Sequence, residues 1–467
     1  MLVGVIQKPT LAEMAALIRR MDTSLYDILE LRLDACADIS VAALRSFSLP
    51  LPAIFTLRCK EQGGFYAQGE EEREDLLEKL MQLGPAYVDL EYSIPPERIR
   101  AIRAISPNTK VILSRHDFAA TPASLEDMLA PMRKAARESS PDGVIYKLAT
   151  LARGTLDTLR MLVFCKERKE SVIGICMGED GMTSRILAPV INAGFCYCPV
   201  EESSAPGQID ARVLRRDYNF YRLNKETAIY GLVGDPIDRS VGHLYHNRQN
   251  AEANCNAVYV KWRLTRGDIP DAMPFFGRLG VAGLSVTMPL KEMVMPFLAD
   301  RDEAVSAIGA VNTLKREKGA WVGVNTDGPG SLALLPTDPT GRKIVFLGAG
   351  GAARAVMHEV GKYTGDIVVF NRSRDKKLPA DVPLLPFSRL RELSAYDVVI
   401  NALPSDASFP FGEVPFIAGA LAVDLSYGKK SLFLEKAEEA GCLCRDGSGM
   451  FTRQAELQRV FWGLPVV

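Results

Sequence analysis

Apolar residues in the first two hundred positions recur in short runs separated by longer amphipathic stretches. Eight runs rich in β-branched residues begin about 20 to 34 residues apart, at 2–7, 26–34, 52–58, 86–92, 110–117, 143–149, 171–177 and 195–200. Between them, stretches such as 10–21, 72–83, 124–138 and 155–168 carry apolar residues at helical spacing, and several open with Ser, Thr or acidic residues suited to helix N-caps. Eight strand-then-helix units in about 220 residues predict an α/β fold of the (β/α)8 barrel type, with a doubly wound open sheet as the alternative.

Charged side chains lie at the ends of several predicted strands: Glu30, Arg32, Arg58, Asp89, Glu91, His116 and Lys147. In a barrel these ends meet at one mouth, where the active site lies. Lys147 closes an apolar strand, where burial and cationic neighbours are expected to lower its pKa and leave an amine able to attack a carbonyl. His116 on the neighbouring strand is within reach as a proton carrier. Each residue alone is more often structural, but together with several arginines they predict Schiff-base chemistry on an anionic keto acid.

These residues lie in motifs that resemble the type I 3-dehydroquinate dehydratases. The matching stretches, in order, are ELRLD (30–34), FTLR…GG (55–64), SRHDF (114–118), YKLA (146–149), MGEDGMTSR (177–185) and SSAPGQI (203–209). The resemblance implies that Lys147 forms an imine with the C3 ketone of the substrate, and that His116 removes a C2 proton and helps expel the C1 hydroxyl as water. It also implies that Arg185 holds the carboxylate, while the ring and its hydroxyls are bound by Glu30, Arg32, Arg58, Ser204 and Gln208.

One position departs from the pattern of that family. A Glu precedes the Gly-Gly pair in the family and helps to orient the catalytic His, whereas this chain has Gln62 there and Glu61 one residue earlier. Gln62 can hydrogen-bond His116 but cannot stabilise its imidazolium. A small shift of the loop that brings Glu61 to this place is the alternative.

A second α/β pattern begins after a short polar connection near residue 224. Residues 340–377 read as strand, glycine-rich turn, helix and strand, with Gly348, Gly350, Gly351 and Arg354 in the turn and at the start of the helix. Such glycines let the backbone approach a pyrophosphate on the helix N-terminus. The next strand ends in NRSR (371–374) instead of the acidic residue typical of NAD binders, which favours NADP, unless these arginines only form a solvated loop.

This second part resembles the shikimate dehydrogenase family. The resemblance rests on GDPIDRSVGHLYHN (234–247), LSVTMPLK (284–291), AVNT (310–313), GVNTDGPG (323–330), GAGGAAR (348–354), NRSR (371–374), INALP (400–404), DLSYG (424–428) and DGSGMFTRQAELQRVFWG (446–463). It implies that Lys291 and Asp327 form the catalytic pair beside the substrate carbonyl; in isolation, two such charges would be a surface ion pair. The implied substrate-binding residues are Ser240, Gly242, Thr287, Asn312, Asp327, Tyr427 and Gln454. The implied NADP-binding residues are Gly348, Ala349, Gly350, Gly351, Ala352, Asn371, Arg372, Ser373, Leu425 and Gly447.

The substrate loop of this part departs from the family pattern P-I-x-H-S-x-S-P-x-x-H-N. Arg239 replaces the first His, Gly242 the second Ser and His243 the Pro. One hydroxyl donor to the carboxylate is therefore absent. Either Arg239 compensates for it, or the pocket has room for the additional C1 hydroxyl of quinate.

Composition and charge exclude several classes of protein. Of the 467 residues, 47% are apolar and 24% charged, as in soluble globular proteins, and the net charge is −1. Neither half is strongly basic, so neither nucleic acid nor a membrane is an expected partner. The nine cysteines form no C-x-x-C pair, which indicates reduced thiols and no zinc or other metal site. The N-terminus has no signal-peptide pattern and no run of 18 apolar residues occurs, so we expect a mature, soluble, cytoplasmic protein.

The sequence therefore predicts a two-step enzyme built from three domains. A dehydratase barrel is expected over 1–222, a substrate-binding domain over 225–335 completed by a C-terminal helix at 450–467, and a Rossmann NADP-binding domain over 338–449. The barrel would convert 3-dehydroquinate to 3-dehydroshikimate, and the rest would reduce that product to shikimate with NADPH. Two alternatives stay open: a dehydrogenase that acts on quinate, and a barrel that binds dehydroquinate without catalysis.

Overall fold

The structure, a computed structural model, describes the chain except residues 140–142, 192, 202–204, 337, 374–377, 379–381 and 405–407. It forms two compact units. The first contains residues 1–229, 243–264 and 270–281, and the second contains residues 230–242, 265–269 and 282–467. The bounds of these units do not coincide with the domain boundaries predicted from the sequence, because they separate strands of one sheet. The three-domain division therefore stays a prediction.

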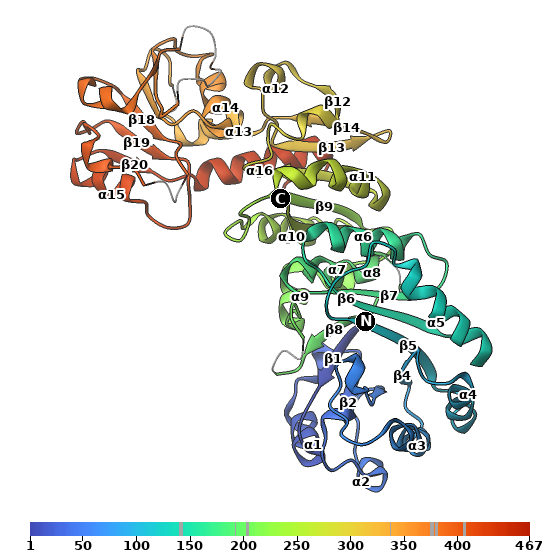
Figure 1. The fold of residues 1–467 in the computed structure, drawn as a ribbon. Helices are drawn as coiled ribbons and strands as arrows, with labels where there is room; N and C mark the ends of the chain where they lie inside the picture. Colours follow the sequence, from blue (N-terminus) through green and yellow to red (C-terminus); the bar gives the residue numbers. More distant parts are fainter. Residues whose placement is uncertain are drawn as a thin grey trace. The chain divides into compact units, whose positions relative to one another are not determined.

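Eight parallel strands form the first sheet, drawn from blue to green in Figure 1. They are β1 (Leu2–Ile6), β2 (Ile28–Arg32), β3 (Ala53–Thr56), β4 (Tyr87–Glu91), β5 (Lys110–Asp117), β6 (Ile145–Leu151), β7 (Val172–Met177) and β8 (Cys196–Pro199). Neighbours in the sheet follow chain order from β1 to β7, and β8 pairs with β1. This is the strand order of a (β/α)8 barrel and not of a doubly wound sheet. The sheet curls on itself, because side chains from β1 to β3 and from β5 to β8 share one interior core.

Helices follow the strands of this barrel, as the amphipathic stretches predict. They are α1 (Leu11–Arg20), α2 (Val41–Arg45), α3 (Glu70–Met81), α4 (Pro96–Ile105), α5 (Glu126–Ser139), α6 (Thr155–Lys166), α7 (Met182–Ile186), α8 (Ala188–Ile191) and α9 (Ala211–Tyr218). The side chain of Thr10 caps the N-terminus of α1, and three glutamates occupy the first turn of α3, where they complement the helix dipole.

A mixed sheet follows, with the order β10-β9-β11-β13-β14-β12. Its strands are β9 (Ala228–Gly234), β10 (Ala257–Arg263), β11 (Val281–Val286), β12 (Leu298–Arg301), β13 (Thr313–Glu317) and β14 (Ala320–Val324). The helices in this part of the chain are α10 (Gly242–Glu252), α11 (Ile269–Leu279), α12 (Glu303–Ile308) and α13 (Asp327–Ser331), and the C-terminal helix is α16 (Ser448–Trp462). In the second unit, Trp462 of α16 donates a hydrogen bond to the carbonyl oxygen of Leu314 on β13, so the end of the chain is attached to this sheet.

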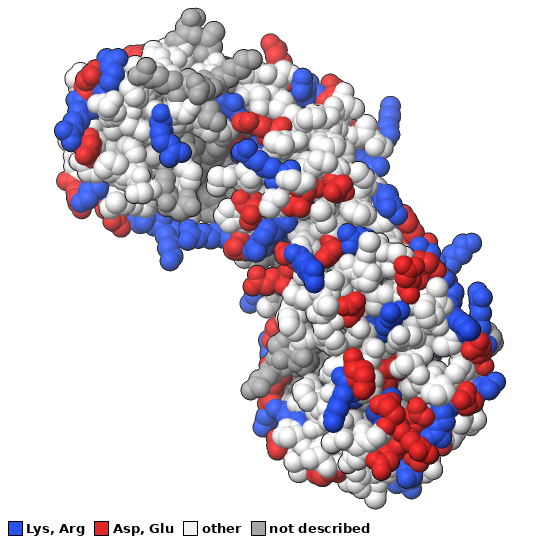
Figure 2. All heavy atoms as spheres, in the orientation of Figure 1, with Lys and Arg blue, Asp and Glu red and all other residues white. Residues whose placement is uncertain are grey.

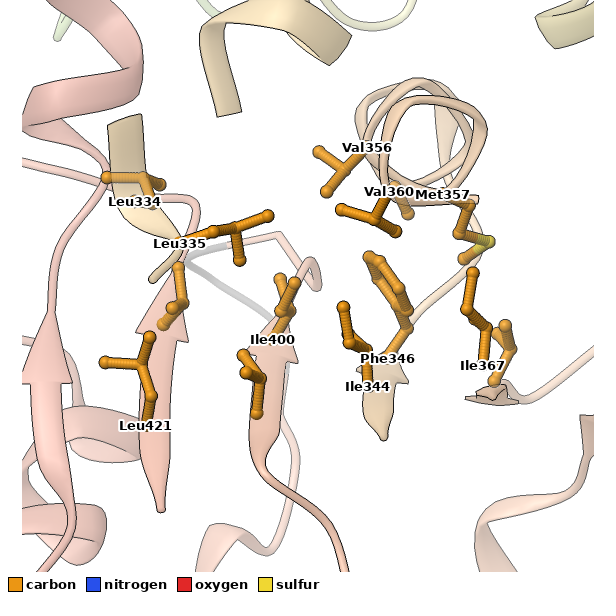
Figure 3. Close-up of a cluster of buried hydrophobic side chains, with 14 of the residues drawn as sticks. Leu334, Leu335, Ile344, Phe346, Val356, Met357, Val360, Ile367, Ile400 and Leu421 are labelled. Carbon is orange, nitrogen blue, oxygen red and sulfur yellow. The ribbon is translucent and has the colours of Figure 1, made fainter. Parts of the chain in front are cut away.

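The third sheet is parallel and has the order β17-β16-β15-β18-β19-β20. Its strands are β15 (Ile344–Leu347), β16 (Ile367–Phe370), β17 (Leu384–Leu385), β18 (Val398–Asn401), β19 (Leu421–Asp424) and β20 (Leu443–Arg445), with helices α14 (Gly351–Val360) and α15 (Leu432–Glu439). In order of appearance this is 3-2-1-4-5-6, the Rossmann order. Figure 3 shows Val356, Met357 and Val360 of α14 above Phe346 of β15, a packing that brings the helix N-terminus to the end of that strand.

Charges of both signs are mixed over the face shown in Figure 2. Acidic side chains gather over α3, where Glu74, Asp75 and Glu78 surround Arg98. All nine cysteines are free thiols. Among the described residues, no helix is both long and apolar enough to cross a membrane.

Candidate active sites

Lys147 lies inside the barrel between two carboxylates. It is buried on β6, and its Nζ is 2.9 Å from Oδ2 of Asp89 on β4 and 3.6 Å from Oε1 of Glu30 on β2. Thr56 donates a hydrogen bond of 2.9 Å to the same oxygen of Glu30. The cationic neighbours expected from the sequence are not the groups in direct contact, because the inward positions of β2 and β4 are occupied by acids.

Arg58 is buried beside this group and is fully engaged by it. Its guanidinium lies 2.9 Å from Asp89 and 3.1 Å from Glu91, and it donates a 2.5 Å hydrogen bond to the hydroxyl of Ser114. Burial alone would raise the pKa of Asp89, but the positive charges of Arg58 and Lys147 outweigh it and hold that pKa below its usual range. Asp89 is therefore ionised at neutral pH and keeps the ammonium of Lys147 in place.

His116 on β5 is held by Gln62, which ends the short 3₁₀ helix Lys60–Gln62. Oε1 of Gln62 accepts a 2.7 Å hydrogen bond from the backbone nitrogen of His116 and lies 3.2 Å from its Nδ1. An oxygen that faces Nδ1 requires a proton there, so the neutral ring carries its free lone pair on Nε2. Burial, reinforced by the charges of Arg58 and Lys147, lowers the pKa of His116 well below its ordinary value.

Arg185 on α7 is a buried cation whose donors meet, among the described residues, only backbone oxygens. Its guanidinium donates to the carbonyl oxygen of Cys176 and, at 3.4 Å, to that of Pro206, while its Nε has no hydrogen-bond partner. Among the residues with described positions, it pairs with no carboxylate. Burial without a counter-ion lowers the pKa of Arg185. This arrangement leaves charge and donors available to a small anion.

In the second unit, Lys291 forms an ion pair with Asp327. Lys291 follows β11, and Asp327 is the first residue of α13. The other oxygen of Asp327 accepts a 2.8 Å hydrogen bond from the side chain of Asn312, whose amide also donates at 3.0 Å to Thr326. Gln454 of α16 accepts a hydrogen bond of 3.4 Å from the same threonine hydroxyl. The pair is thus part of a polar network and is not an isolated surface contact.

The substrate loop and the chain after β19 meet at Tyr427. Its side chain hydrogen-bonds Ser240, and its ring lies 4.9 Å from that of Phe451 between centroids. The backbone nitrogen of Gly242, the first residue of α10, donates to the hydroxyl of Ser240 at 3.3 Å. Thr287 follows β11, and its backbone nitrogen donates to Val233 at the end of β9.

The glycine-rich turn joins β15 to α14, as expected. Gly348 has a φ of +103°, a region that favours glycine, and a Cβ there would lie 3.2 Å from the backbone of Ala402. A Cβ at Gly350 would meet open space, whereas one at Gly351 would lie 3.7 Å from the side chain of Lys291. The turn and the Lys291–Asp327 pair are therefore adjacent within the second unit.

Two family models match the chain. The model described as type I 3-dehydroquinase matches residues 4–225, and the model of the shikimate dehydrogenase substrate binding domain matches residues 232–314. The bifunctional 3-dehydroquinate dehydratase/shikimate dehydrogenase, chloroplastic, of Arabidopsis thaliana is 31% identical over 476 residues, which cover 94% of this chain and 78% of the relative. The chain belongs to this bifunctional family.

Two further relatives match most of the chain and half of it, respectively. The shikimate biosynthesis protein AroDE of Chlamydia muridarum is 32% identical over 406 residues, covering 83% of this chain and 80% of the relative. The shikimate dehydrogenase (NADP(+)) of Hyphomonas neptunium is 33% identical over 247 residues, covering 50% of this chain and 92% of the relative.

The residues predicted for the dehydratase half are brought together only in part. Glu30, Arg58, His116 and Lys147 share one interacting group. Arg32 is held by Asp34 through two hydrogen bonds of 2.9 and 2.8 Å. Gln208 accepts a hydrogen bond from the backbone nitrogen of Ala205 at 3.3 Å, and Ser204 lies outside the described residues.

The predicted cofactor-binding residues of the dehydrogenase half lie at the strand ends of the Rossmann sheet. Asn371, Arg372 and Ser373 follow β16, and the side chain of Asn371 donates to the carbonyl oxygen of Ser373 at 2.7 Å. Leu425 follows β19, and Gly447 packs so closely against it that a Cβ would lie 2.3 Å from the oxygen of Leu425. Ala349 and Ala352 flank the two glycines at the start of α14, and Arg374 is outside the described residues.

Several interacting residues were missed by reasoning from the sequence. Arg73 of α3 is buried and bridges Glu91 at 2.9 Å and Glu70, and Ser114 hydrogen-bonds Asp89 at 2.6 Å. Asp89 and Glu91 of β4 could be recognised from the sequence, since they alternate with apolar residues in a predicted strand. Arg73 could not, because the packed structure determines which side of a charged helix faces the barrel.

The structure also decides whether Gln62 or Glu61, in the loop before Gly63, contacts His116. Gln62, and not Glu61, contacts His116. The carboxylate of Glu61 instead lies within 4.8 Å of ligand atoms of Cys59 and Glu70, a grouping in which both acids are exposed. Because Glu70 is also paired with Arg73, this grouping needs no metal ion to account for it.

Proposed function

We propose that this chain catalyses two consecutive steps of the shikimate pathway. The barrel dehydrates 3-dehydroquinate to 3-dehydroshikimate, and the remaining chain reduces 3-dehydroshikimate to shikimate with NADPH. The observation that carries the proposal is the similarity to the Arabidopsis bifunctional enzyme over 94% of this chain. The geometry around Lys147 and around Lys291 supports one reaction each.

In the first reaction Lys147 is the nucleophile. The ammonium of Lys147 gives up one proton, which the carbonyl oxygen gains as the freed amine attacks C3, so a C–N bond forms while the C–O double bond opens. The oxygen then takes a second proton from Nζ and leaves as water, and the C=N double bond of an iminium remains. Asp89, held by Arg58, accepts a hydrogen bond from Nζ and fixes its position. The iminium acts as an electron sink, which acidifies the neighbouring C2–H bond.

His116 then carries the proton. Its Nε2, left free by the contact of Nδ1 with Gln62, removes the C2 proton. The electrons of the resulting enamine expel the C1 hydroxyl, which takes the proton from His116 and leaves as water. Hydrolysis of the new iminium releases the product and restores the amine of Lys147.

Arg185 is the expected partner of the substrate carboxylate. Its guanidinium is buried and unpaired with any described carboxylate, so a bound carboxylate would supply the missing counter-ion. Glu30, Arg32, Ser204 and Gln208 are proposed to bind the ring hydroxyls. Because Arg58 is occupied by Asp89 and Glu91, we assign it the positioning of Asp89.

In the second reaction Lys291 and Asp327 are the catalytic pair. Bound NADPH supplies a hydride to the carbonyl carbon. Lys291 donates the proton that the carbonyl oxygen gains, and Asp327, oriented by Asn312, holds the ammonium against that oxygen. Ser240, Thr287, Tyr427 and Gln454 are proposed to bind the substrate hydroxyls and carboxylate.

The turn after β15 fits a dinucleotide. Among the described residues no side chain caps the N-terminus of α14, and the open space beyond Gly350 leaves room for a pyrophosphate on its first N–H groups. Arg372, which follows β16, is proposed to bind the 2′-phosphate of NADP. The proximity of Gly351 to Lys291 supports transfer between this nucleotide and a substrate held by the pair.

Quinate is a second candidate substrate for the dehydrogenase half, because the loop before α10 departs from the family pattern. Gly242 provides no hydroxyl where the family has Ser, which favours quinate, with its extra hydroxyl, as an alternative. The ratio of kcat/KM for shikimate and quinate oxidation decides between the two. If shikimate is the substrate, Gly242→Ser should lower its KM.

We also propose that the protein is cytoplasmic and that its partners are these small molecules, with neither nucleic acid nor membrane. The balanced charge of both halves supports this assignment.

The proposal is tested with the whole chain, dehydroquinate and NADPH. We expect NADPH to be consumed and shikimate to form, as detected by mass spectrometry. Lys147→Met should abolish consumption with dehydroquinate but retain it with 3-dehydroshikimate. If the unmodified chain uses only added 3-dehydroshikimate, the barrel binds without catalysis and the two-step proposal is wrong.

A further inference from the structure

One layer of the barrel interior consists of side chains from alternate strands. Lys147 of β6 contacts both Glu30 of β2 and Asp89 of β4 there. A barrel layer normally takes a fourth side chain from the remaining even-numbered strand, β8. That side chain is Tyr197, whose ring centroid lies 4.1 Å from Nζ of Lys147.

Tyr197 is buried, and packing alone does not explain its position. Its hydroxyl has no hydrogen-bond partner among the described residues, although it is enclosed. Burial, reinforced by the negative charges of Glu30 and Asp89, raises the pKa of Tyr197 well above its ordinary value, so the ring is neutral. The group that faces Lys147 is therefore the neutral aromatic face.

We propose that the ring face of Tyr197 stabilises the positive charge on Nζ of Lys147 when this atom becomes an iminium nitrogen. The inference rests on the proposed Schiff-base function of Lys147. Aromatic faces attract cations through their quadrupole, and the attraction is strongest where water is excluded.

The need for such a group follows from what the reaction does to Nζ. The ammonium of Lys147 has three N–H donors and uses them on carboxylates such as Asp89. When the C–N double bond forms and water leaves, the nitrogen keeps its positive charge but only one N–H. The single N–H can be donated to Asp89 or to Glu30 but not to both, whereas attraction to an aromatic face requires no donor. Tyr197 exchanges neither proton nor electrons in this step.

The test separates the ring face from the hydroxyl and from packing. Tyr197→Phe keeps the face and is the reference, Tyr197→Leu removes it, and Tyr197→pentafluorophenylalanine keeps the shape but reverses the quadrupole. Phe195→Leu is the matched control, since Phe195 is a buried ring two residues earlier, immediately before β8, and in the same interior core. Dehydratase kcat and KM, and the fraction of chain trapped by borohydride with dehydroquinate, are measured for each full-length variant.

We expect kcat of the Leu and pentafluorophenylalanine variants to be about 5- to 30-fold below that of Tyr197→Phe, with less trapped adduct and a smaller change in KM. Phe195→Leu should stay within about threefold of the unmodified chain. Equal kcat for the phenylalanine and pentafluorophenylalanine variants would overturn the inference, as would an equal loss in Phe195→Leu. If the unmodified chain forms no adduct on Lys147, the proposed dehydratase mechanism fails, and this inference fails with it.

Discussion

The side-chain oxygen of Gln62 contacts both the backbone nitrogen of His116, at 2.7 Å, and its ring Nδ1, at 3.2 Å. One neutral acceptor therefore fixes the backbone position and the tautomer of the proposed base. A carboxylate in the same place would do the same and would also stabilise the imidazolium. The amide orients the ring without favouring its charged form.

This contact predicts the pH dependence of dehydration. His116 must be neutral to accept the C2 proton, and burial together with Arg58 and Lys147 lowers its pKa well below 6.5, so activity should persist in mildly acidic solution. Asp89 and Arg32 also face the ring, with opposing effects. Gln62→Glu should raise the pKa of His116 and move the acid limb of kcat/KM to higher pH by about one unit.

The matched control for this variant is Glu61→Gln, because Glu61 is the adjacent residue and faces Cys59 and Glu70 instead of His116. Its acid limb should coincide with that of the unmodified chain. A profile that does not move in Gln62→Glu would show that the amide does not control the protonation of His116.

Asp89 predicts a pH-dependent stability of the barrel. Its folded pKa lies below its ordinary value of 3.8, so its contribution is complete above that value and is lost as pH falls toward the folded pKa. Asp89→Asn leaves the buried cations Arg58 and Lys147 with one carboxylate fewer, and should lower the free energy of unfolding by about 3 kcal/mol at neutral pH. Urea unfolding at several pH values measures this, and a variant as stable as the parent would contradict the account.

Lys291 and Asp327 predict a selective loss of the second activity. Lys291→Met should reduce the rate of 3-dehydroshikimate reduction on the order of 100-fold or more, because the carbonyl oxygen loses its proton donor. Asp327→Asn should lower it as well, since the ammonium is no longer held. The dehydration rate of the same preparations serves as the internal control. A parallel loss of both activities would point to misfolding and not to a local role.

From the position of Arg372 after β16 we predict that this residue sets the preference for NADPH over NADH. Arg372→Asp removes a cation expected at the 2′-phosphate and adds an acid suited to a 2′-hydroxyl, so the ratio of kcat/KM for NADPH to NADH should fall on the order of tenfold or more. Arg391→Asp is a control of equal charge change, since Arg391 is exposed and pairs with Glu413. An unchanged ratio in Arg372→Asp would support the solvated-loop interpretation.

The periodicity of apolar residues predicted the strands and helices of the barrel but left the doubly wound sheet open as an alternative. All eight barrel strands and the Rossmann turn occur where the pattern placed them, because buried parallel strands and amphipathic helices leave distinct periods in a sequence. The doubly wound alternative failed because neighbouring strands follow chain order.

The contacts within the site were less predictable. Strand-end positions indicated that Lys147 and Glu30 face one mouth, but not that Asp89 would be nearest to Lys147 or that Arg58 would be occupied. Such pairings depend on strand register and on the helix face that Arg73 presents. Tyr197 lies within an apolar run, and only the layered interior brings its ring onto Nζ of Lys147.

Covalent trapping of Lys147 tests the central claim most directly. The intact chain is incubated with dehydroquinate and sodium borohydride, digested, and examined by peptide mass spectrometry. The account predicts a stable secondary-amine adduct on the peptide that contains Lys147, absent when substrate is omitted and absent in Lys147→Met. A catalytically active chain with no adduct, or with an adduct on another lysine, would contradict it.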